Sequence, residues 1–396
     1  MAIGTLKAGV NSQDVTASTG SDVADTVNYV YETVEALPSA AVITNRAKTG
    51  MLKTTFFGNS YVNRPTGFVK PFASKSNDVY FLKNAGNGGD ESAELLARLN
   101  DVPDNTDLVF VFEGVNDSIY AVTPEVHAAN TKAILENLVG RGFRTALILT
   151  GPNKSPLNST LGDPDLIKEY NLYDWVTCFN LGVECYGSLS QFFNDDGTGW
   201  FASGVDEDGV HLSNESFRLF GYTLAADRYA KNYAYPLAFK TNTGLLADAM
   251  FTTGTASTFP TGWAQGGTIT KGCSVTSLGK GKTITISGNA NALAYAQSPE
   301  ITTVIGKRYV AMCKYSCDIA GTDAKAELYM RAVSNSSNRQ YLLQDAYVSQ
   351  EAGVYMLEWV ADVTAYKLFM TFSGSDYNIT ANLAQLTVFC LDDYEI

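Results

Sequence analysis

Residues Thr54–Tyr61 read TTFFGNSY, and this stretch decides how the first half of the chain folds. Its first four residues are β-branched or aromatic, which are the residue types of a buried strand. Gly58 and Asn59 end that strand, because both tolerate the tight backbone conformations of a turn. Ser60 then stands at the carboxyl end of the strand, where open parallel sheets form their binding sites. We therefore expect Ser60 to be functional, although a G-N-S turn alone is also common structural chemistry.

Strand-like and helix-like patterns alternate from this stretch to about residue 232. The predicted strands are 53–58, 78–84, 107–113, 144–150 and 174–180. The predicted helices are 90–99, 123–140, 164–172 and 214–232. Such alternation indicates a parallel sheet covered by helices on both faces. Five strands fit a flavodoxin-like three-layer α/β/α domain, which we place at residues 50–236.

The sequence changes character at about residue 250. Short runs rich in β-branched and aromatic residues, such as KTITISG and KLFMTFS, alternate with turns rich in Gly, Ser and Asn. Regularly spaced short strands without a helical pattern indicate an antiparallel β-sandwich, which we expect to be jelly-roll-like. We predict that residues 250–396 form this second domain and that residues 237–249 link it to the α/β domain.

The N-terminal segment, residues 1–49, carries one helical pattern. Between Ser21 and Leu37, apolar residues recur at spacings of 4, 3, 4 and 3. They are Val23, Val27, Val30, Val34 and Leu37. This is the seam of a coiled coil, but it is only about two heptads long. It fits either an attachment and oligomerisation helix or an amphipathic helix that packs on its own domain.

Composition limits the partners that the chain can have. The 396 residues carry a formal net charge of −13. Nucleic acid and anionic membrane surfaces both attract clustered Lys and Arg, so we expect neither as a partner. No apolar run approaches the roughly 20 residues of a membrane span, so we expect no membrane insertion. The N-terminus has no apolar core behind a basic start, which predicts that there is no signal peptide.

The cysteines and histidines give no sign of a metal site. The six cysteines lack the paired C-x-x-C spacing of zinc ligands, and the chain has two histidines. We therefore expect no metal and no cofactor. Cys178 and Cys185 flank a predicted turn and could form a disulfide, but buried free thiols are the expected state.

Three further motifs follow elements of the α/β domain. NAGNGGDES, residues 84–92, opens a helix, and its glycines let backbone N–H groups approach a ligand at the positive end of the helix dipole. GVND, residues 114–117, offers an Asn amide that can donate to a developing oxyanion. DGVH, residues 208–211, places Asp and His three residues apart, where the carboxylate can fix the imidazole tautomer. Each motif alone is also ordinary turn chemistry, and their order is what points to catalysis.

In this order the motifs resemble the sequence blocks of the SGNH hydrolases, also called the GDSL esterase/lipase family, over roughly residues 50–235. The resemblance implies that Ser60 is the nucleophile, His211 the general base and Asp208 its orienting partner. It also implies a serine esterase that needs neither metal nor cofactor.

The same resemblance implies an oxyanion hole. Its donors would be the backbone N–H groups of Ser60 and Gly89 and the side chain of Asn116, with Gly86 as a less favoured choice than Gly89. One position departs from the family: Asn59 stands where the first block has Asp. That Asp is not a triad member, so we expect the geometry to be retained, with activity that could be altered.

A loop from Gly182 to Glu207 carries several aromatic residues. Rings beside a serine nucleophile suit stacking on sugars, although they fit a local hydrophobic plug equally well. We predict Trp200, Tyr186 and Phe192 as substrate-binding residues. We find no broad apolar lid in the sequence, so we expect a short acyl group such as O-acetyl. His127, the second histidine, is expected on a helix surface.

The order of segments resembles phage tail-spike or tail-fibre proteins, and the β-sandwich resembles carbohydrate-binding modules. This resemblance implies a homotrimer on a virion, or an extracellular protein, that deacetylates a host polysaccharide of capsule or O-antigen type. Two alternatives stay open. One is a virion adhesin that binds surface glycan without cutting it, favoured only by Asn59. The other is a bacterial carbohydrate esterase or lipase.

Overall fold

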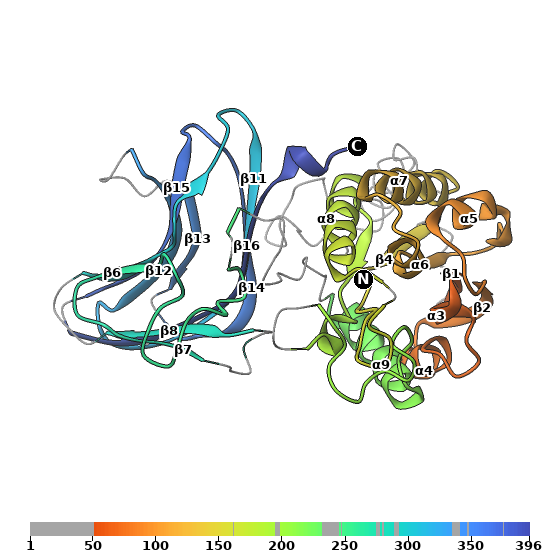
Figure 1. The fold of residues 1–396 in the computed structure, drawn as a ribbon, viewed down its shortest axis with the longest axis horizontal. Helices are drawn as coiled ribbons and strands as arrows, with labels where there is room; N and C mark the ends of the chain where they lie inside the picture. The colour runs from red at the N-terminus through yellow and green to blue at the C-terminus, as the bar shows by residue number, and fades with distance from the viewer. Residues whose placement is uncertain are drawn as a thin grey trace, which may run out of the picture.

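We describe a computed structural model of the chain, in which two domains lie side by side (Figure 1). The structure describes residues 51–160, 162–194, 199–231, 245–246, 248–274, 278, 281–288, 293–334, 341–346, 348–374 and 376–396. The predicted N-terminal helix, with its apolar seam, lies outside these residues, as does most of the predicted linker.

The first domain is built on a parallel five-stranded sheet with the strand order β2-β1-β3-β4-β5. The strands are β1 (Leu52–Gly58), β2 (Val79–Gly86), β3 (Leu108–Phe112), β4 (Arg144–Ile148) and β5 (Glu184–Tyr186). Strand β3 is buried throughout, and β1 is buried from Thr54 onward. Such continuous burial is typical of a parallel sheet that is covered on both faces.

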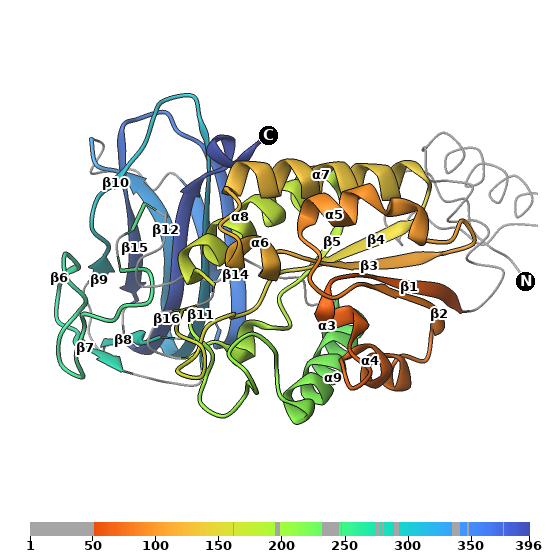
Figure 2. The ribbon, with the colours of Figure 1, turned by 45° about the vertical axis from the view of Figure 1, so that its right-hand side comes forward.

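Helices cover both faces of this sheet (Figure 2). One face carries α4 (Val69–Lys75) and α9 (Asn214–Ala230). The other carries α5 (Ser92–Ala97), α7 (Pro124–Gly140) and α8 (Pro164–Leu181). Two short helices, α3 (Ser60–Asn63) and α6 (Val115–Ile119), follow β1 and β3 at the carboxyl edge of the sheet. The predicted three-layer α/β/α architecture is confirmed.

The predicted fifth strand at 174–180 is wrong. These residues belong to α8, and the fifth strand is the short β5 that follows Gly182. Helix α8 is buried on two sides, because its own sheet covers one side and the β-sandwich covers another. Trp175 packs edge-on against Phe389 of the sandwich, with ring centroids 6.1 Å apart. A helix that is buried on two sides lacks the one-sided pattern by which helices are recognised.

The second domain is an antiparallel β-sandwich, as predicted. One sheet has the order β13-β12-β15-β9-β6, with β10 paired to β15, and the other has the order β14-β11-β16-β8-β7. The strands are β6 (Ala264–Gly266), β7 (Thr270–Ser274), β8 (Thr283–Gly288), β9 (Ala294–Gln297), β10 (Ile301–Thr302), β11 (Arg308–Thr322), β12 (Lys325–Ala332), β13 (Tyr341–Ala346), β14 (Gln350–Val360), β15 (Ala365–Ser373) and β16 (Asp376–Cys390).

The two domains share a hydrophobic cluster where α8 meets the sandwich. Met312 of β11 and Phe389 of β16 are buried in the same cluster as Trp175. A final turn of 3-10 helix (Leu391–Tyr394) extends this contact, because the ring of Tyr394 packs on Tyr173 of α8 with centroids 4.9 Å apart. The exact domain boundaries stay a prediction from the sequence.

Two smaller expectations concern the thiols and the membrane. All six cysteines are free and buried, so Cys178 and Cys185 are not joined by a disulfide. Burial raises the pKa of the Cys178 thiol well above its ordinary value, which keeps the thiol protonated.

In the described part of the chain, no helix combines the length and the apolar character that a membrane crossing requires.

Candidate active site

The carboxyl end of β1 presents Ser60 to a histidine from a distant loop. The strand ends at Gly58, where a Cβ atom would lie 2.3 Å from a backbone oxygen of β3, so only glycine fits. The side chain of Asn59 caps α3 by accepting a hydrogen bond from the Tyr61 N–H at 3.2 Å. Ser60 is therefore the first residue of this helix, and its Oγ lies 2.8 Å from Nε2 of His211.

The other side of His211 is held by Asp208. Nδ1 of His211 lies 2.8 Å from Oδ2 of Asp208, and Oδ1 accepts the backbone N–H groups of His211 at 2.7 Å and Val210 at 2.9 Å. Burial opposes ionisation of Asp208, but these hydrogen bonds outweigh it and lower the pKa of the carboxyl. The structure thus joins Ser60, His211 and Asp208 in one line, in which the carboxylate can orient the imidazole and the imidazole can accept the serine proton.

Two further contacts hold the 208–211 turn against α3. Oη of Tyr61 donates to the backbone oxygen of Val210 at 2.6 Å, and its ring lies 5.7 Å from the His211 ring. Arg64, which follows α3, forms an ion pair with Glu207. Burial raises the pKa of Tyr61, so its hydroxyl stays a donor. The sequence prediction missed both contacts, because they join residues 149 and 143 positions apart and leave no local signal.

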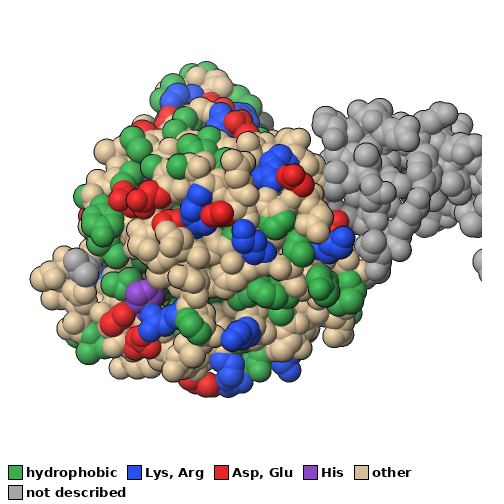
Figure 3. Space-filling view, turned by 90° about the vertical axis from the view of Figure 1, so that its right-hand side faces the viewer, with side chains coloured by type: hydrophobic (Ala, Val, Ile, Leu, Met, Phe, Trp, Pro, Cys, Tyr) green, Lys and Arg blue, Asp and Glu red, His purple; other side chains and the backbone are tan. Residues whose placement is uncertain are grey.

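The line of three residues reaches the molecular surface. Figure 3 shows a histidine on the outer face of the α/β domain, flanked by acidic and basic side chains. Of the two histidines, His127 is fully buried and His211 is partly exposed. The side chain of His211 is 20% exposed and that of Asp208 is 47% exposed. Access to water lets His211 exchange its proton, as a general base must do between turnovers.

The end of β2 and the loop that follows it contain the two glycines considered for the second backbone donor, Gly86 and Gly89. Gly86 is structural, because its N–H donates to Oδ1 of Asn84 at 3.0 Å and a Cβ there would lie 2.4 Å from the backbone nitrogen of Asn63. Gly89 has a φ of +91° and open space around its Cβ position. Of the two glycines, Gly89 is therefore the one with space in front of it for a ligand.

Asn116 is hydrogen-bonded to the same loop. Its Nδ2 donates to the backbone oxygen of Asp90 at 2.8 Å. The loop also reaches Ser60, because a Cβ at Gly88 would lie 3.9 Å from Cβ of Ser60. An amide nitrogen carries two hydrogens, so Asn116 keeps one that it can donate to an oxyanion.

The prediction that His127 lies on a helix surface is wrong, since this residue is fully buried. Its Nδ1 lies 2.8 Å from Asp117, and its Nε2 lies 3.2 Å from both Glu113 and Asp174. A signal for this burial was present in the sequence. His127 stands in register with buried α7 residues at 131, 134 and 138, which follow it at spacings of 4, 3 and 4.

Glu113, Asp117 and His127 also bear on the question of a metal. Among the described residues these three place one ligand atom each within 4.8 Å of one another. Both ring nitrogens of His127, however, already lie at hydrogen-bond distance from carboxyl oxygens. We therefore interpret the group as an ion-pair cluster.

Two of the three predicted substrate-binding rings are core residues. Tyr186 is 0% exposed and Phe192 is 2% exposed, and both belong to the cluster between the sheet and α9. Their prediction as substrate contacts is wrong, because a fully buried ring has no face free for a sugar. The alternative interpretation, a hydrophobic plug, describes them correctly. Trp200 is partly exposed, and Nζ of Lys154 lies 5.6 Å from its ring centroid.

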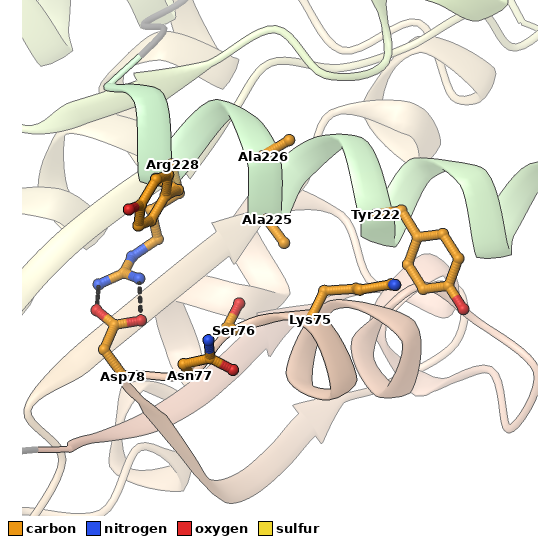
Figure 4. Close-up of a pocket in the computed structure, with 9 residues that line it drawn as sticks. Lys75, Ser76, Asn77, Asp78, Tyr222, Ala225, Ala226 and Arg228 are labelled. Carbon is orange, nitrogen blue, oxygen red and sulfur yellow. Dashed lines mark hydrogen bonds and ion pairs between the residues drawn. The ribbon is translucent and has the colours of Figure 1, made fainter.

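A pocket of about 480 Å³ lies between α4 and α9 (Figure 4). Lys75, Tyr222 and an ion pair of Arg228 with Asp78 line it, and both oxygens of Asp78 accept guanidinium N–H groups at 2.7 Å. Asp78 immediately precedes β2, whereas Ser60 follows the end of β1, and the two strands run parallel. The pocket and Ser60 therefore lie at opposite edges of the sheet.

Comparison with known proteins gives matches among solved structures. No family model and no curated protein matches the chain. A protein assigned to the lipolytic G-D-S-L family, from Desulfitobacterium hafniense, is 19% identical with a TM-score of 0.38 and covers 44% of this chain and 98% of its own. An acetyl xylan esterase is 18% identical with a TM-score of 0.39 and covers 44% and 98%. A GDSL-like lipase from Bacteroides thetaiotaomicron is 15% identical with a TM-score of 0.39 and covers 49% and 98%.

Proposed function

We propose that the chain is a serine esterase in which Ser60 attacks an ester carbonyl, His211 accepts the serine proton and Asp208 orients His211. The observation that carries this proposal is the continuous line of the three side chains, with 2.8 Å at both contacts. Attack of Oγ on the carbonyl carbon forms a tetrahedral oxyanion, whose collapse expels the alcohol with the proton from His211. Water then hydrolyses the acyl-enzyme by the same route.

The oxyanion would be received at the carboxyl edge of the sheet. The proposed donors are the backbone N–H groups of Ser60 and Gly89 and the free hydrogen of the Asn116 amide. A preorganised donor of this kind contributes roughly 2–4 kcal/mol to transition-state stabilisation. The bond from Asn116 to the loop that carries Gly89 supports this assignment, since it fixes the two donors relative to each other.

The substrate that we propose is a short acyl ester, such as O-acetyl, on a polysaccharide. Support comes from the loop at 182–207, whose rings could have formed the wall of a long acyl channel. Four of them, Tyr186, Phe192, Phe193 and Phe201, are packed into the core instead. Trp200 stays partly exposed beside Lys154, where an indole ring can stack on a sugar.

Hydrolysis of p-nitrophenyl acetate tests the esterase proposal. Ser60→Ala should lower kcat/KM by at least about 10⁴-fold, because the nucleophile is lost. Ser74→Ala is the matched control, since Ser74 lies on exposed α4 and bonds only to the backbone oxygen of Pro71. Equal rates for wild type and Ser60→Ala would reject the proposal.

Two measurements test the substrate. An octanoyl ester should react much more slowly than the acetyl ester, because a site for acetyl has no room for the longer chain. Trp200→Ala should raise KM for an acetylated polysaccharide and leave p-nitrophenyl acetate hydrolysis unchanged. Comparable rates on both esters would overturn the short-acyl assignment, and an unchanged KM would remove Trp200 from the sugar site.

The contacts of Asn59 give no added support to the non-catalytic adhesin. That alternative was favoured only by Asn59, and this side chain caps α3 while Ser60 remains in contact with His211. A bacterial carbohydrate esterase or lipase remains an alternative with the same chemistry.

We also propose the biological setting that the sequence suggests, a virion or extracellular homotrimer acting on a capsule or O-antigen polysaccharide. The support is the apolar seam between Val23 and Leu37 together with the order of the segments. Light scattering on the full-length protein tests the assembly. A mass of one chain at micromolar concentration rejects the homotrimer.

A further inference from the structure

The buried cluster around His127 joins four parts of the α/β domain. His127 comes from α7, and the ring faces Glu113 after β3, Asp117 of α6 and Asp174 of α8. Tyr170 of α8 stacks on the imidazole, with ring centroids 4.0 Å and planes 13° apart. Glu113, Asp117, Asp174 and Tyr170 are the titratable groups that contact the ring in the described structure.

Both ring nitrogens point at carboxyl oxygens. Nδ1 lies 2.8 Å from Asp117, and Nε2 lies 3.2 Å from Asp174. A neutral imidazole carries a hydrogen on one nitrogen and a lone pair on the other, so one of these contacts would oppose a lone pair to an oxygen. A doubly protonated ring donates in both directions. The geometry is therefore that of an imidazolium cation.

The surrounding charges agree with this protonation. Burial alone would lower the pKa of His127, but attraction by Glu113 and Asp174 and hydrogen bonds to Asp117 and Asp174 raise it well above its ordinary value. Burial raises the pKa of Glu113 well above its ordinary range. Burial also opposes ionisation of Asp117, but its hydrogen bond with His127 lowers that pKa. The doubly protonated ring thus lies within reach of three carboxyl groups, those of Glu113, Asp117 and Asp174.

Asp117 connects this cation to the proposed oxyanion hole. Its carboxylate accepts the backbone N–H of Ser92 at 3.1 Å and the Ser92 hydroxyl at 3.2 Å. The preceding residue, Asn116, donates to the backbone oxygen of Asp90 at 2.8 Å. Two consecutive residues of α6 thus hold the end of the loop that carries Gly89.

We propose that His127 is a positioning residue: as a permanent cation it fixes Asp117 and, through Asp117, the Asn116 amide and the Gly89 loop. The inference rests on the proposed esterase function, because the alignment of the oxyanion donors matters only if the chain hydrolyses esters. Without the cation, Asp117 and Asp174 would be buried carboxylates without a counter-charge. Helix α6 would then move relative to the loop, and the donors would lose the alignment that the transition state requires.

Nitrogen NMR of the histidine rings tests the charge without any need for activity. The chain has two histidines, so His211→Ala leaves His127 as the only imidazole. We expect both ring nitrogens of His127 to stay protonated above about pH 6.5, where an ordinary histidine becomes neutral. The shifts of a neutral tautomer near pH 7, or those of a metal-bound nitrogen together with one divalent ion per chain, would overturn the proposal.

Two amide variants test the positioning role. In His127→Asn the amide nitrogen takes the place of Nδ1 and can still donate to Asp117, whereas in His127→Gln it takes the place of Nε2 and can donate only toward Asp174. We expect kcat on p-nitrophenyl acetate to fall about tenfold or more in His127→Gln, with KM little changed, and to fall less in His127→Asn.

If His127 had a merely structural role, kcat of both variants would fall in proportion to their loss of thermal stability. That result would overturn the positioning role. If neither variant folds, the NMR measurement still decides whether His127 is a cation. An inactive wild type would reject the esterase proposal. The NMR measurement would still test the charge of His127 independently.

Discussion

Each of the two histidines of this chain contacts a carboxyl group and a tyrosine ring, but the two differ in burial and in the number of carboxyl groups. His211 has one carboxylate, Asp208, and a serine hydroxyl on its other nitrogen, and its side chain is 20% exposed. His127 is 0% exposed and contacts the carboxyl groups of Glu113, Asp117 and Asp174. Both rings also pack against a tyrosine.

The difference shows what decides the chemistry of an imidazole. His211 contacts one carboxylate and is accessible to water, so it can gain and lose a proton. The Ser60 hydroxyl at its Nε2 is the group from which it can accept one. With carboxyl groups at both nitrogens and no exposed surface, His127 is placed to keep its proton. The same residue is therefore suited to be a base in one place and a fixed cation in the other.

The largest expected effect separates the two histidines by activity. His211→Ala should lower kcat on p-nitrophenyl acetate by about 10⁴–10⁶-fold, because serine loses its base. Thermal unfolding should change little, since the His211 ion pair is partly exposed. A variant that retained more than a few per cent of wild-type kcat would remove His211 from the mechanism.

The second prediction separates them by stability. His127→Phe keeps the ring that stacks on Tyr170 but removes the cation, so unfolding free energy should fall by about 3–5 kcal/mol, the usual cost of breaking a buried ion pair. His211→Phe is the matched control and should cost about 1 kcal/mol or less. Chemical denaturation of the three proteins measures both values. Equal losses at the two positions would contradict the comparison.

The stability difference at His127 should also depend on pH. A histidine whose folded pKa is raised contributes stability that is fully present below its unfolded value of about 6.5 and is lost as pH rises through the folded value. The gap between wild type and His127→Phe should therefore be wide near neutral pH and close on the alkaline side. Urea titrations at a series of pH values measure it, and a gap that widened with pH would show that His127 is neutral in the folded protein.

The third prediction concerns the oxyanion donor that lies between the two clusters. Asn116→Ala should lower kcat by about 10²–10³-fold, because one preorganised donor is removed. Asn180→Ala, on α8, is a control, since its amide contacts Glu395 near the C-terminus and not the proposed oxyanion hole. A loss below about threefold would exclude the Asn116 amide as a donor.

Much of this fold could be predicted because each structural signal is local. The first four strands are apolar runs of strand length, and the structure places them within about two residues of the prediction. The candidates Ser60, Asn116, Asp208 and His211 could be singled out because each stands in a short motif beside a regular element. The fifth strand was misplaced because residues 174–180 belong to a helix that is buried on two sides, and that arrangement depends on the β-sandwich.

What the sequence could not give is whether a side chain faces the core or a ligand. Tyr186 and Phe192 have the composition of a sugar-binding wall, and only the packing of the loop against α9 shows that they are core residues. His127 gave a helical-register signal that placed it on the apolar face of α7, yet its carboxyl partners come from three separate elements. Long-range partners of this kind cannot be read from local pattern.

The smallest expected effect compares the two tyrosines that pack on the two histidines. Tyr61 donates to the backbone oxygen of Val210 at 2.6 Å, and Tyr170 donates to that of Val122 at 2.5 Å. Tyr61→Phe and Tyr170→Phe each remove one such hydrogen bond and keep the ring, so each should lower the unfolding free energy by about 1 kcal/mol. Only Tyr61 holds the turn that carries His211 against the nucleophile. Tyr61→Phe should therefore also lower kcat, by about threefold to tenfold, since about 1 kcal/mol of misalignment corresponds to that range. Steady-state kinetics of the two variants decide the point: an equal fall in kcat for both would mean that the Tyr61 hydroxyl supports the fold alone and does not position His211.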